Sequence, residues 1–305
     1  MKNVVIFGLG AIGALIAAQF SETNYPVKIL CDTDRKEKYQ QKGIIVNNKK
    51  YNFNYLTKEE FKRKPDLVII SLKYYHLREA IKQLDGLIGK NTVIISLLNG
   101  IDSEEIIAER FSYENIVHAF IYKIDATRVN NNVHYSNQGI IVFGNKDNIA
   151  NEKTSLIKNI FDKAKVNYEF SNNIMKRMWW KYMVNIGINQ TTATLKAPYR
   201  VIQKVPYARE LARKAMQETV EVSQAIGINL SKKDIDDVIE LTDGLNPDGK
   251  TSMCQDVLAN RKTEVEMFSG KLCQLGEKYN VATPVNWMFY RLIKSIEILN
   301  DMRSF

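Results

Sequence analysis

The first eighteen residues carry an apolar pattern that predicts a strand, a glycine turn and a helix. The apolar run 4–7 leads into the segment Gly8, Leu9, Gly10, Ala11, Ile12 and Gly13, and the small apolar residues 14–18 follow. In this order, G-x-G-x-x-G is typical of a dinucleotide-binding unit. Gly8 would form the tight turn, Gly10 would let a pyrophosphate approach the backbone, and Gly13 would let the helix pack closely. The pyrophosphate would then lie at the helix N-terminus, which favours anions.

Two other interpretations of this segment stay open. Lys2 and the apolar run through Ala18 are compatible with a secretory signal peptide, although no clear small-residue cleavage site follows. The glycine pattern also occurs by chance in α/β proteins that bind no nucleotide.

Up to about residue 170, short β-branched runs alternate with helical stretches. Strands are predicted at 27–31, 67–71, 92–97 and 140–143, and helices at 77–84 and 103–111. Asparagine-rich turns predict a small hairpin within 43–53 and a further turn between strands within 128–135. The alternation predicts an α/β fold, a Rossmann-type doubly wound parallel sheet with right-handed crossovers.

After Ser171 the strand-like runs vanish and helical spacing takes over. Helices are predicted at 172–196, 205–226, 232–241, 252–279 and 284–301. Prolines stand near the starts of several of these segments, as Pro284 does after Thr283. We therefore expect two domains, a dinucleotide-binding Rossmann domain over 1–171 and an all-helical substrate or catalytic domain over 172–305.

Composition narrows the class of protein. Beyond the N-terminal segment, no stretch of about 18 uncharged apolar residues occurs, so we expect a soluble protein with no membrane partner. Cys31, Cys254 and Cys273 lie far apart and form no metal-binding motif, which favours a reduced, cytoplasmic protein without a metal site. The net charge is +9, but the lysines are scattered and no nucleic-acid motif occurs, so no nucleic-acid partner is expected.

One predicted helix carries an unusual polar stripe. Residues 178–189 are apolar nearly all round, which indicates burial, and the polar exceptions Lys181, Asn185 and Asn189 are each four residues apart. A buried lysine loses hydration, and asparagine is a poor residue for a helix interior. The stripe is either a narrow solvated face or a row of hydrogen-bond donors with one ammonium that faces a cleft.

Two further residues are ambiguous on sequence alone. Ser252 follows the turn 246–249 and could be a helix N-cap, which is the better interpretation from the sequence. Glu264 could be an ordinary surface carboxylate.

The motifs together resemble the ketopantoate reductase (2-dehydropantoate 2-reductase) family over essentially the whole chain. The resemblance rests on the N-terminal GxGAIG, SLK at 71–73, LLNG at 97–100, the Lys181, Asn185 and Asn189 triplet, SMxQD at 252–256, Thr263 with Glu264, and ATPxN at 282–286. It implies hydride transfer from a nicotinamide cofactor to 2-ketopantoate, which gives pantoate on the route to coenzyme A.

The resemblance also implies roles for individual residues. Lys181 would be the general acid, and Glu264 would hold that lysine and the substrate hydroxyl. Asn185 and Asn189 would bind the hydroxyl end of the substrate, and Ser252 would bind its carboxylate. Asn99 and Lys73 would line the nicotinamide side of the cleft. An ammonium in a partly dry cleft can stabilise and protonate the alkoxide that hydride addition creates.

Two positions depart from the family pattern. Tyr199 stands where the family often has a further asparagine, which leaves room for another 2-keto acid. Asp32 stands at the end of the second predicted strand, where the family typically has a basic residue for the 2′-phosphate. Because an acidic residue at this spacing usually binds a ribose 2′-hydroxyl, NADP(H) is the expected cofactor and NAD(H) stays open. Asp32 could also merely cap the next helix.

Three functions are compatible with the sequence. The leading one is a 2-ketopantoate reductase, the second is a reductase of another 2-keto acid, and the third is a non-catalytic dinucleotide sensor. A sensor would need neither Lys181 nor Glu264. The expected partner is a small 2-keto acid, and a homodimer is compatible with the sequence.

Overall fold

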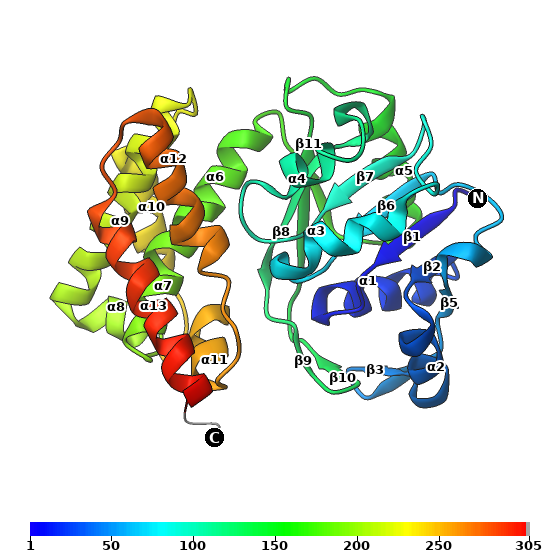
Figure 1. Cartoon of the computed structure of the whole chain (residues 1–305), viewed down its shortest axis with the longest axis horizontal. Coiled ribbons are helices and arrows are strands. Elements are labelled where there is room, and N and C mark those ends of the chain that lie inside the picture. The colour runs from blue at the N-terminus through cyan, green and yellow to red at the C-terminus, as the bar shows by residue number, and fades with distance from the viewer. Residues whose placement is uncertain (303–305) are drawn as a thin grey trace. The chain divides into compact units, whose positions relative to one another are not determined.

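The computed structural model describes residues 1–302 and divides the chain into two compact units. The first unit is Met1–Ile174, and the second begins at Met175. Figure 1 shows the elements of each unit. The first contains all the strands among the described residues, and the second is helical.

A five-stranded parallel sheet forms the centre of the first unit. Its order is β5 (Asn54–Leu56), β2 (Val27–Leu30), β1 (Val4–Phe7), β6 (Leu67–Ile70) and β7 (Val93–Ser96). Val4 and Ile6 belong to one apolar cluster and Val5 and Phe7 to another, because successive side chains of a strand point to opposite faces. Both faces are thus buried, as in a Rossmann-type sheet, and the predicted fold class is confirmed.

Helical segments lie between the strands of this unit or follow them. They are α1 (Ala11–Glu22), α2 (Thr33–Lys42), the short turns η1 (Lys58–Glu60) and η2 (Tyr74–His76), α3 (Leu77–Ala80), η3 (Ile81–Leu84), α4 (Ser103–Ala108), η4 (Tyr113–Asn115) and α5 (Glu152–Ala164). The helix predicted over 77–84 is therefore a short α-helix continued by a 3₁₀ turn.

The predicted hairpin within 43–53 is present, and the turn predicted within 128–135 joins two strands of a second one. The strands are β3 (Ile44–Val46), β4 (Lys49–Tyr51), β9 (Thr127–Val129) and β10 (Asn132–His134), in the order β4-β3-β10-β9. Asn47 and Asn48 both have positive φ, 44° and 67°, which the tight turn requires. The parallel pairing of β3 with β10 joins the two hairpins into one sheet. No local sequence pattern predicts the pairing of β3 with β10, because the two strands lie far apart in the sequence.

The prediction for 140–143 was wrong in one respect. The strand exists as β11 (Gln138–Gly144), but it lies in a separate sheet, antiparallel to β8 (His118–Ile124) and parallel to β12 (Tyr168–Phe170). Strand β8 was not predicted from the sequence. Once β8 precedes β11, the short connection through β9 and β10 favours an antiparallel pair over a crossover.

The second unit is built from helices. They are α6 (Ile174–Val184), η5 (Asn185–Asn189), α7 (Gln190–Thr194), α8 (Arg200–Lys204), α9 (Pro206–Ala225), α10 (Lys232–Asp243), α11 (Ser252–Leu258), η6 (Glu266–Gly270), α12 (Lys271–Tyr279) and α13 (Pro284–Met302). The elements η5 and η6 are π-helical. Helix α8 was not predicted from the sequence.

One helix of the prediction was wrong. The segment 252–279 is not continuous, because the chain leaves the helix after Leu258 and becomes helical again at Glu266. Asn260 adopts a positive φ of 52°, and the Arg261 amide turns back to the Asp256 carbonyl at 2.8 Å. Helical periodicity on both sides of the break hides it in the sequence.

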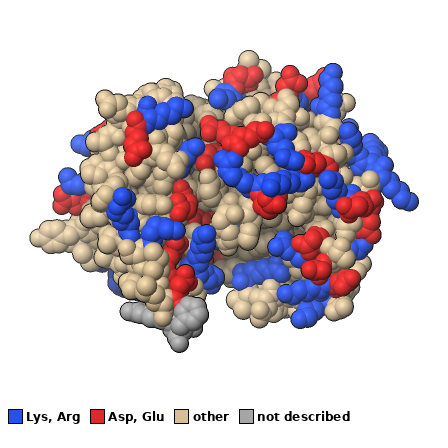
Figure 2. Space-filling model, in the orientation of Figure 1, with Lys and Arg blue, Asp and Glu red and all other residues tan. Residues whose placement is uncertain are grey.

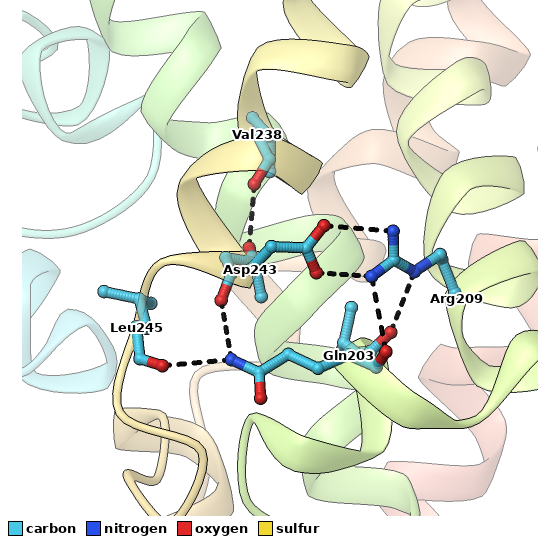
Figure 3. A network of polar contacts seen from close by, with 7 residues as sticks. Gln203, Arg209, Val238, Asp243 and Leu245 are labelled. Atoms are coloured by element: carbon cyan, nitrogen blue, oxygen red, sulfur yellow. Dashed lines mark hydrogen bonds and ion pairs between the residues drawn. The ribbon is translucent and has the colours of Figure 1, made fainter.

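A polar network on the surface of this unit joins α8, α9 and α10 (Figure 3). The Gln203 side chain donates to the carbonyls of Thr242 and Leu245 at 2.9 and 3.0 Å. The Arg209 guanidinium forms a two-point contact with the Asp243 carboxylate. Because the guanidinium also reaches the Ile202 carbonyl at 3.0 Å, it ties the end of α10 to α8.

Charge is distributed as the sequence predicts. On the face seen in Figure 2, basic and acidic side chains lie intermixed. In residues 1–302, no helix combines the length and the apolar character needed to cross a membrane.

Candidate active site

The glycine turn between β1 and α1 has the geometry that a dinucleotide needs. Gly8 has φ +104°, and a Cβ there would lie 2.3 Å from the Ser71 carbonyl oxygen. A Cβ on Gly13 would lie 1.9 Å from the Gly8 carbonyl oxygen, so both positions require glycine for packing. At Gly10 a Cβ would make only an ordinary van der Waals contact, 3.8 Å from the Ser71 carbonyl oxygen, so packing alone does not require glycine there. Gly10 is the N-cap of α1 and no side chain caps it, so the turn fits a pyrophosphate.

Lys73 and Asn99 follow two neighbouring strands of the same sheet. Lys73 comes shortly after β6, and Asn99 comes shortly after β7. Because β1, β6 and β7 are parallel, their carboxyl ends meet at one edge together with the glycine turn. In open α/β sheets this edge is where ligands bind.

Asp32 caps α2. Its carboxylate accepts from the Arg35 amide at 2.8 Å and lies 3.5 Å from the Arg35 Nε, and about half of the side chain is exposed. Lys36 pairs instead with Glu60. The interpretation of Asp32 as a helix cap is therefore correct, although a cap at the end of β2 can still meet a ribose.

Next to Asp32, α2 and the β9–β10 turn enclose an open hollow of about 480 Å³. Arg35, Lys38, Lys42 and Arg128 line it together with Tyr39 and Asn130, Asn131 and Asn132. The lining has four basic residues and no carboxylate, so the potential within the hollow is positive.

The polar stripe lies on one continuous helical segment with a π-helical insert. Lys181 is on α6, and Asn185 and Asn189 begin and end η5. Both asparagines are more than nine-tenths buried, and the Asn189 Nδ2 donates to the Asn185 Oδ1 at 3.0 Å. The buried Nδ2 of Asn185 has no hydrogen-bond partner among the described residues. A buried donor without a partner is costly, and π-helical segments often mark functional sites.

The rest of this segment is anchored in the core. Tyr182 is fully buried and donates to the Phe268 carbonyl at 2.6 Å. The Trp179 ring meets the Tyr182 ring edge-on, with centroids 5.6 Å apart. Lys181 therefore projects from a helix whose backbone is anchored in the core.

Burial lowers the pKa of Lys181 to about 8, against an opposing effect of the negative charge of Glu264. Burial desolvates the ammonium, while the residue as a whole keeps partial contact with solvent. A lysine in such surroundings can give up its proton near neutral pH, which an ordinary surface lysine cannot.

Glu264 lies in the break that the helical periodicity hides. The preceding residue, Thr263, is buried and donates from its amide and its hydroxyl to the Glu297 Oε1, at 2.7 and 2.6 Å. The second Glu297 oxygen pairs with Lys294 at 3.1 Å. Glu297 on α13 therefore holds the backbone that carries Glu264.

The structure corrects the interpretation of Ser252. Thr251, not Ser252, is the N-cap of α11, and its hydroxyl accepts from the Cys254 amide at 3.2 Å. The Thr251 hydroxyl also meets the Thr192 hydroxyl at 2.8 Å, which ties α11 to α7. Ser252 is the first helical residue and its side chain is exposed, so it is not engaged in capping.

Comparison with known proteins places the chain in a family. The model for ketopantoate reductase PanE/ApbA matches residues 4–148, and the model for the C-terminal region of the same family matches residues 173–297. The chain belongs to the ketopantoate reductase family. The resemblance noted from the motifs is thereby confirmed.

Individual relatives of this family match along the whole chain. A 2-dehydropantoate 2-reductase of Streptococcus pyogenes serotype M1 is 26% identical over 304 residues, covering 97% of this chain and 99% of the relative. One from Pyrococcus abyssi is 25% identical over 305 residues, covering 99% and 100%.

Solved structures share the fold. A dimeric ketopantoate reductase from Staphylococcus aureus has a TM-score of 0.84 at 22% identity and covers 98% of this chain and 99% of its own. A D-mandelate dehydrogenase solved with NADH and anilino(oxo)acetate has a TM-score of 0.86 at 24% identity, with the same coverage. At these identities the likeness shows the fold and leaves the substrate open.

Tyr199, the departure from the ketopantoate reductase pattern, is half-buried beside the turn 246–249. Its amide donates to the Gly249 carbonyl at 2.9 Å, and its ring lies 3.1 Å from where a Gly249 Cβ would be. Burial raises the pKa of its phenol, so the hydroxyl stays neutral at physiological pH. Tyr199 thus packs on the loop before Ser252.

A buried network of polar side chains supports the helical segment that carries Lys181, Asn185 and Asn189. Gln190 is fully buried and donates to the Ile186 carbonyl and to Asn286, at 3.0 and 3.3 Å. Asn286 donates to Glu218 at 2.7 Å, and the Glu218 carboxylate also accepts the amides of Val285 and Asn286 at the start of α13. In the sequence Asn286 stands out only as part of a motif, because residues so far apart give no local signal.

Proposed function

We propose that this protein reduces 2-dehydropantoate to pantoate, with NADP(H) as its expected cofactor. The observation that carries the proposal is the pairing of a desolvated lysine, whose pKa is about 8, with the unpartnered amide of Asn185 on the next turn. Together they offer one proton donor and one hydrogen-bond donor for a small polar ligand. Membership of the ketopantoate reductase family supports this ligand as the substrate.

In the proposed reaction, Lys181 is the general acid. A nicotinamide held by this chain would supply the hydride, and the substrate ketone would become an alkoxide. The Lys181 ammonium stabilises that negative charge and delivers the proton from Nζ to the oxygen. The Glu264 charge keeps the ammonium protonated near neutral pH, because it opposes the effect of burial.

The remaining site residues would hold the two ligands. We assign the substrate hydroxyl end to Asn185 and Asn189, and the substrate carboxylate to the exposed hydroxyl of Ser252. On the first unit, Gly8, Leu9, Gly10, Ala11, Ile12 and Gly13 would hold the pyrophosphate. Asn99 and Lys73 would face the nicotinamide. We propose that residues 1–171 form the dinucleotide-binding Rossmann domain and that residues 172–305 form the substrate or catalytic domain.

The preference for NADP(H) over NAD(H) is the finer part of the proposal. Arg35 and the cationic hollow next to Asp32 favour a 2′-phosphate. Asp32 opposes it, since a carboxylate about 4 Å from a phosphate costs roughly 1–4 kcal/mol at dielectrics between bulk water and a protein surface. We therefore propose that the protein uses NADPH and also uses NADH unusually well.

A second candidate, a reductase of another 2-keto acid, is favoured by Tyr199. The phenol is bulkier than the asparagine that the family often has there, and it packs on the loop that leads to Ser252. A non-catalytic sensor is less favoured, because it would need no lysine of lowered pKa. We also propose a homodimer, as reported for the S. aureus enzyme.

Steady-state oxidation of NADPH and NADH against a panel of 2-keto acids tests the proposal. We expect 2-dehydropantoate to give the highest kcat/KM, and Lys181→Ala to lower turnover by roughly 10²- to 10⁴-fold at saturating substrate. A higher kcat/KM for another 2-keto acid would support the second candidate. No turnover with any 2-keto acid, with cofactor binding intact, would support the sensor.

A further inference from the structure

The last long helix, α13, is apolar on the side that faces away from its own unit. Its buried side carries Asn286, Phe289, Ile293 and Asn300. The opposite side, which we call the outer face of α13, carries six large apolar side chains. Their exposed fractions are 51% for Trp287, 43% for Met288, 44% for Leu292, 53% for Ile298, 51% for Leu299 and 67% for Met302.

Another long helix of the same unit shows what a solvated face looks like. Beyond its first turn and before its last residue, the exposed positions of α9 are all polar, namely Glu210, Lys214, Gln217, Glu221 and Gln224. A helix that is apolar nearly all round is normally buried, and a contiguous apolar patch normally marks an interaction site. The outer face of α13 therefore needs a partner that α9 does not need.

The spacing along the outer face identifies the kind of partner. Met288, Leu292, Ser295, Leu299 and Met302 follow one another at intervals of four, three, four and three residues, the seam by which two helices pack together. On either side of Ser295, the next residue of this series is a leucine and the one after it is a methionine. The seam thus presents the same chemistry on both sides of its centre, which is what a two-fold interface between identical surfaces requires.

The polar members of the outer face are suited to burial. The Ser295 hydroxyl donates to the Arg291 carbonyl of its own helix at 2.8 Å, so it needs no partner across an interface. The Arg291 guanidinium lies 3.7 Å from the centre of the Trp287 ring, which stabilises the cation in place. Arginine, tryptophan and methionine are enriched at protein interfaces. A small residue at the centre of the seam would let two helices cross closely.

We propose that the outer face of α13 docks antiparallel onto the same face of a second copy of this chain, with the two-fold axis near Ser295. This surface specifies how the proposed homodimer is built, and to that extent it rests on the proposed function. It places Leu292 and Leu299 at the centre of the contact and Met288 and Met302 at its ends.

Sedimentation equilibrium of the full chain tests the surface, with Leu292→Glu as the variant. We expect the wild type to have the mass of two chains and the variant to dissociate at least about 100-fold more readily, because the two-fold axis buries the new charge twice. Leu241→Glu on α10 is the matched control, since Leu241 is also 44% exposed but lies outside the face. Circular dichroism establishes that both variants fold.

A crosslink tests the position of the axis. Ser295→Cys should form a disulfide between two copies under mild oxidation by copper phenanthroline, and a reductant should reverse it. Gln217→Cys, exposed on α9, should not do so at the same protein concentration. The absence of a crosslink at position 295 in a dimeric protein would overturn the proposed axis.

The other outcomes are equally decisive. A monomeric wild type would overturn the proposal, whether the outer face is then covered by the rest of the chain or binds lipid vesicles. A dimer that survives Leu292→Glu would overturn it as well. Reductase activity of the wild type, measured in parallel, separates this failure from failure of the proposed function, because a monomer that reduces 2-dehydropantoate refutes only the docking surface.

Discussion

Asn189 donates a hydrogen bond from its Nδ2 to the Oδ1 of Asn185 at 3.0 Å, and the buried Nδ2 of Asn185 is left without a hydrogen-bond partner among the described residues. The π-helical segment begins at Asn185 and ends at Asn189, so the two side chains meet although three residues separate them. The pair is thus arranged before any ligand binds. Such preorganisation lowers the cost of ordering the site when a ligand arrives.

Removing the unpartnered amide should weaken substrate binding. We expect Asn185→Ala to raise KM for 2-dehydropantoate by roughly 10- to 100-fold, since a lost hydrogen bond to a ligand costs about 1–3 kcal/mol. Initial-rate kinetics measure this, with Asn172→Ala, an exposed position just before the same helix, as the control. An unchanged KM would show that the Asn185 amide does not meet the substrate.

The pH dependence of reduction should follow the Lys181 ammonium. Burial brings the Lys181 pKa down to about 8, so the acid is charged below this pH and lost above it. We expect kcat/KM for reduction to fall above about pH 8 in the wild type. Because the Glu264 charge raises this pKa, Glu264→Gln should move the fall to lower pH. Glu266→Gln, a neighbouring exposed carboxylate, should leave the profile in place. If the Glu264→Gln profile coincides with that of the wild type, Glu264 is only a surface charge.

Glu297 should act as a positioning residue for Glu264. Glu297→Gln keeps the shape of the side chain but weakens the two contacts from Thr263, so Glu264 should lose its fixed place. We expect a several-fold lower kcat and the same downward shift of the pH profile as in Glu264→Gln, but smaller. Thermal unfolding of the variant, followed by circular dichroism, separates this from a general loss of stability. A stability loss without a shift of the profile would make the contact purely structural.

Cofactor choice should respond to Asp32. We expect Asp32→Ala to improve kcat/KM for NADPH by roughly tenfold, because the repulsion between carboxylate and 2′-phosphate is removed. Loss of the α2 cap would cost about 1 kcal/mol of stability, which a melting curve detects. A wild-type preference for NADPH of a hundredfold or more would contradict the expected role of Asp32, and so would a variant that gains nothing with NADPH.

Much of this protein can be predicted from local sequence. The alternation of apolar residues, the glycine turn and the double asparagine at 47–48 each determine a structure within a few residues, so β1, α1 and the first hairpin are found where they are predicted. The four-residue spacing of Lys181, Asn185 and Asn189 likewise places them on one side of a helix. In all these cases the structure follows from interactions between residues that are close together in the sequence.

Tertiary structure decided what depends on distant residues. β8 joins β11 and β12 in a sheet separate from the parallel one, because β8 pairs with β11. Glu264 lies in a break of the helix, next to Thr263, which donates two hydrogen bonds to Glu297, thirty-three residues after Glu264. The lowered pKa of Lys181 depends on its surroundings, and the identity of the residue alone does not determine it. The capping of α11 by Thr251 and not Ser252 is settled by the contact with Thr192 as well as by the local turn. Long-range packing supplies these contacts, because a hydrogen bond or a desolvated charge is defined by all the groups around it, wherever they stand in the chain.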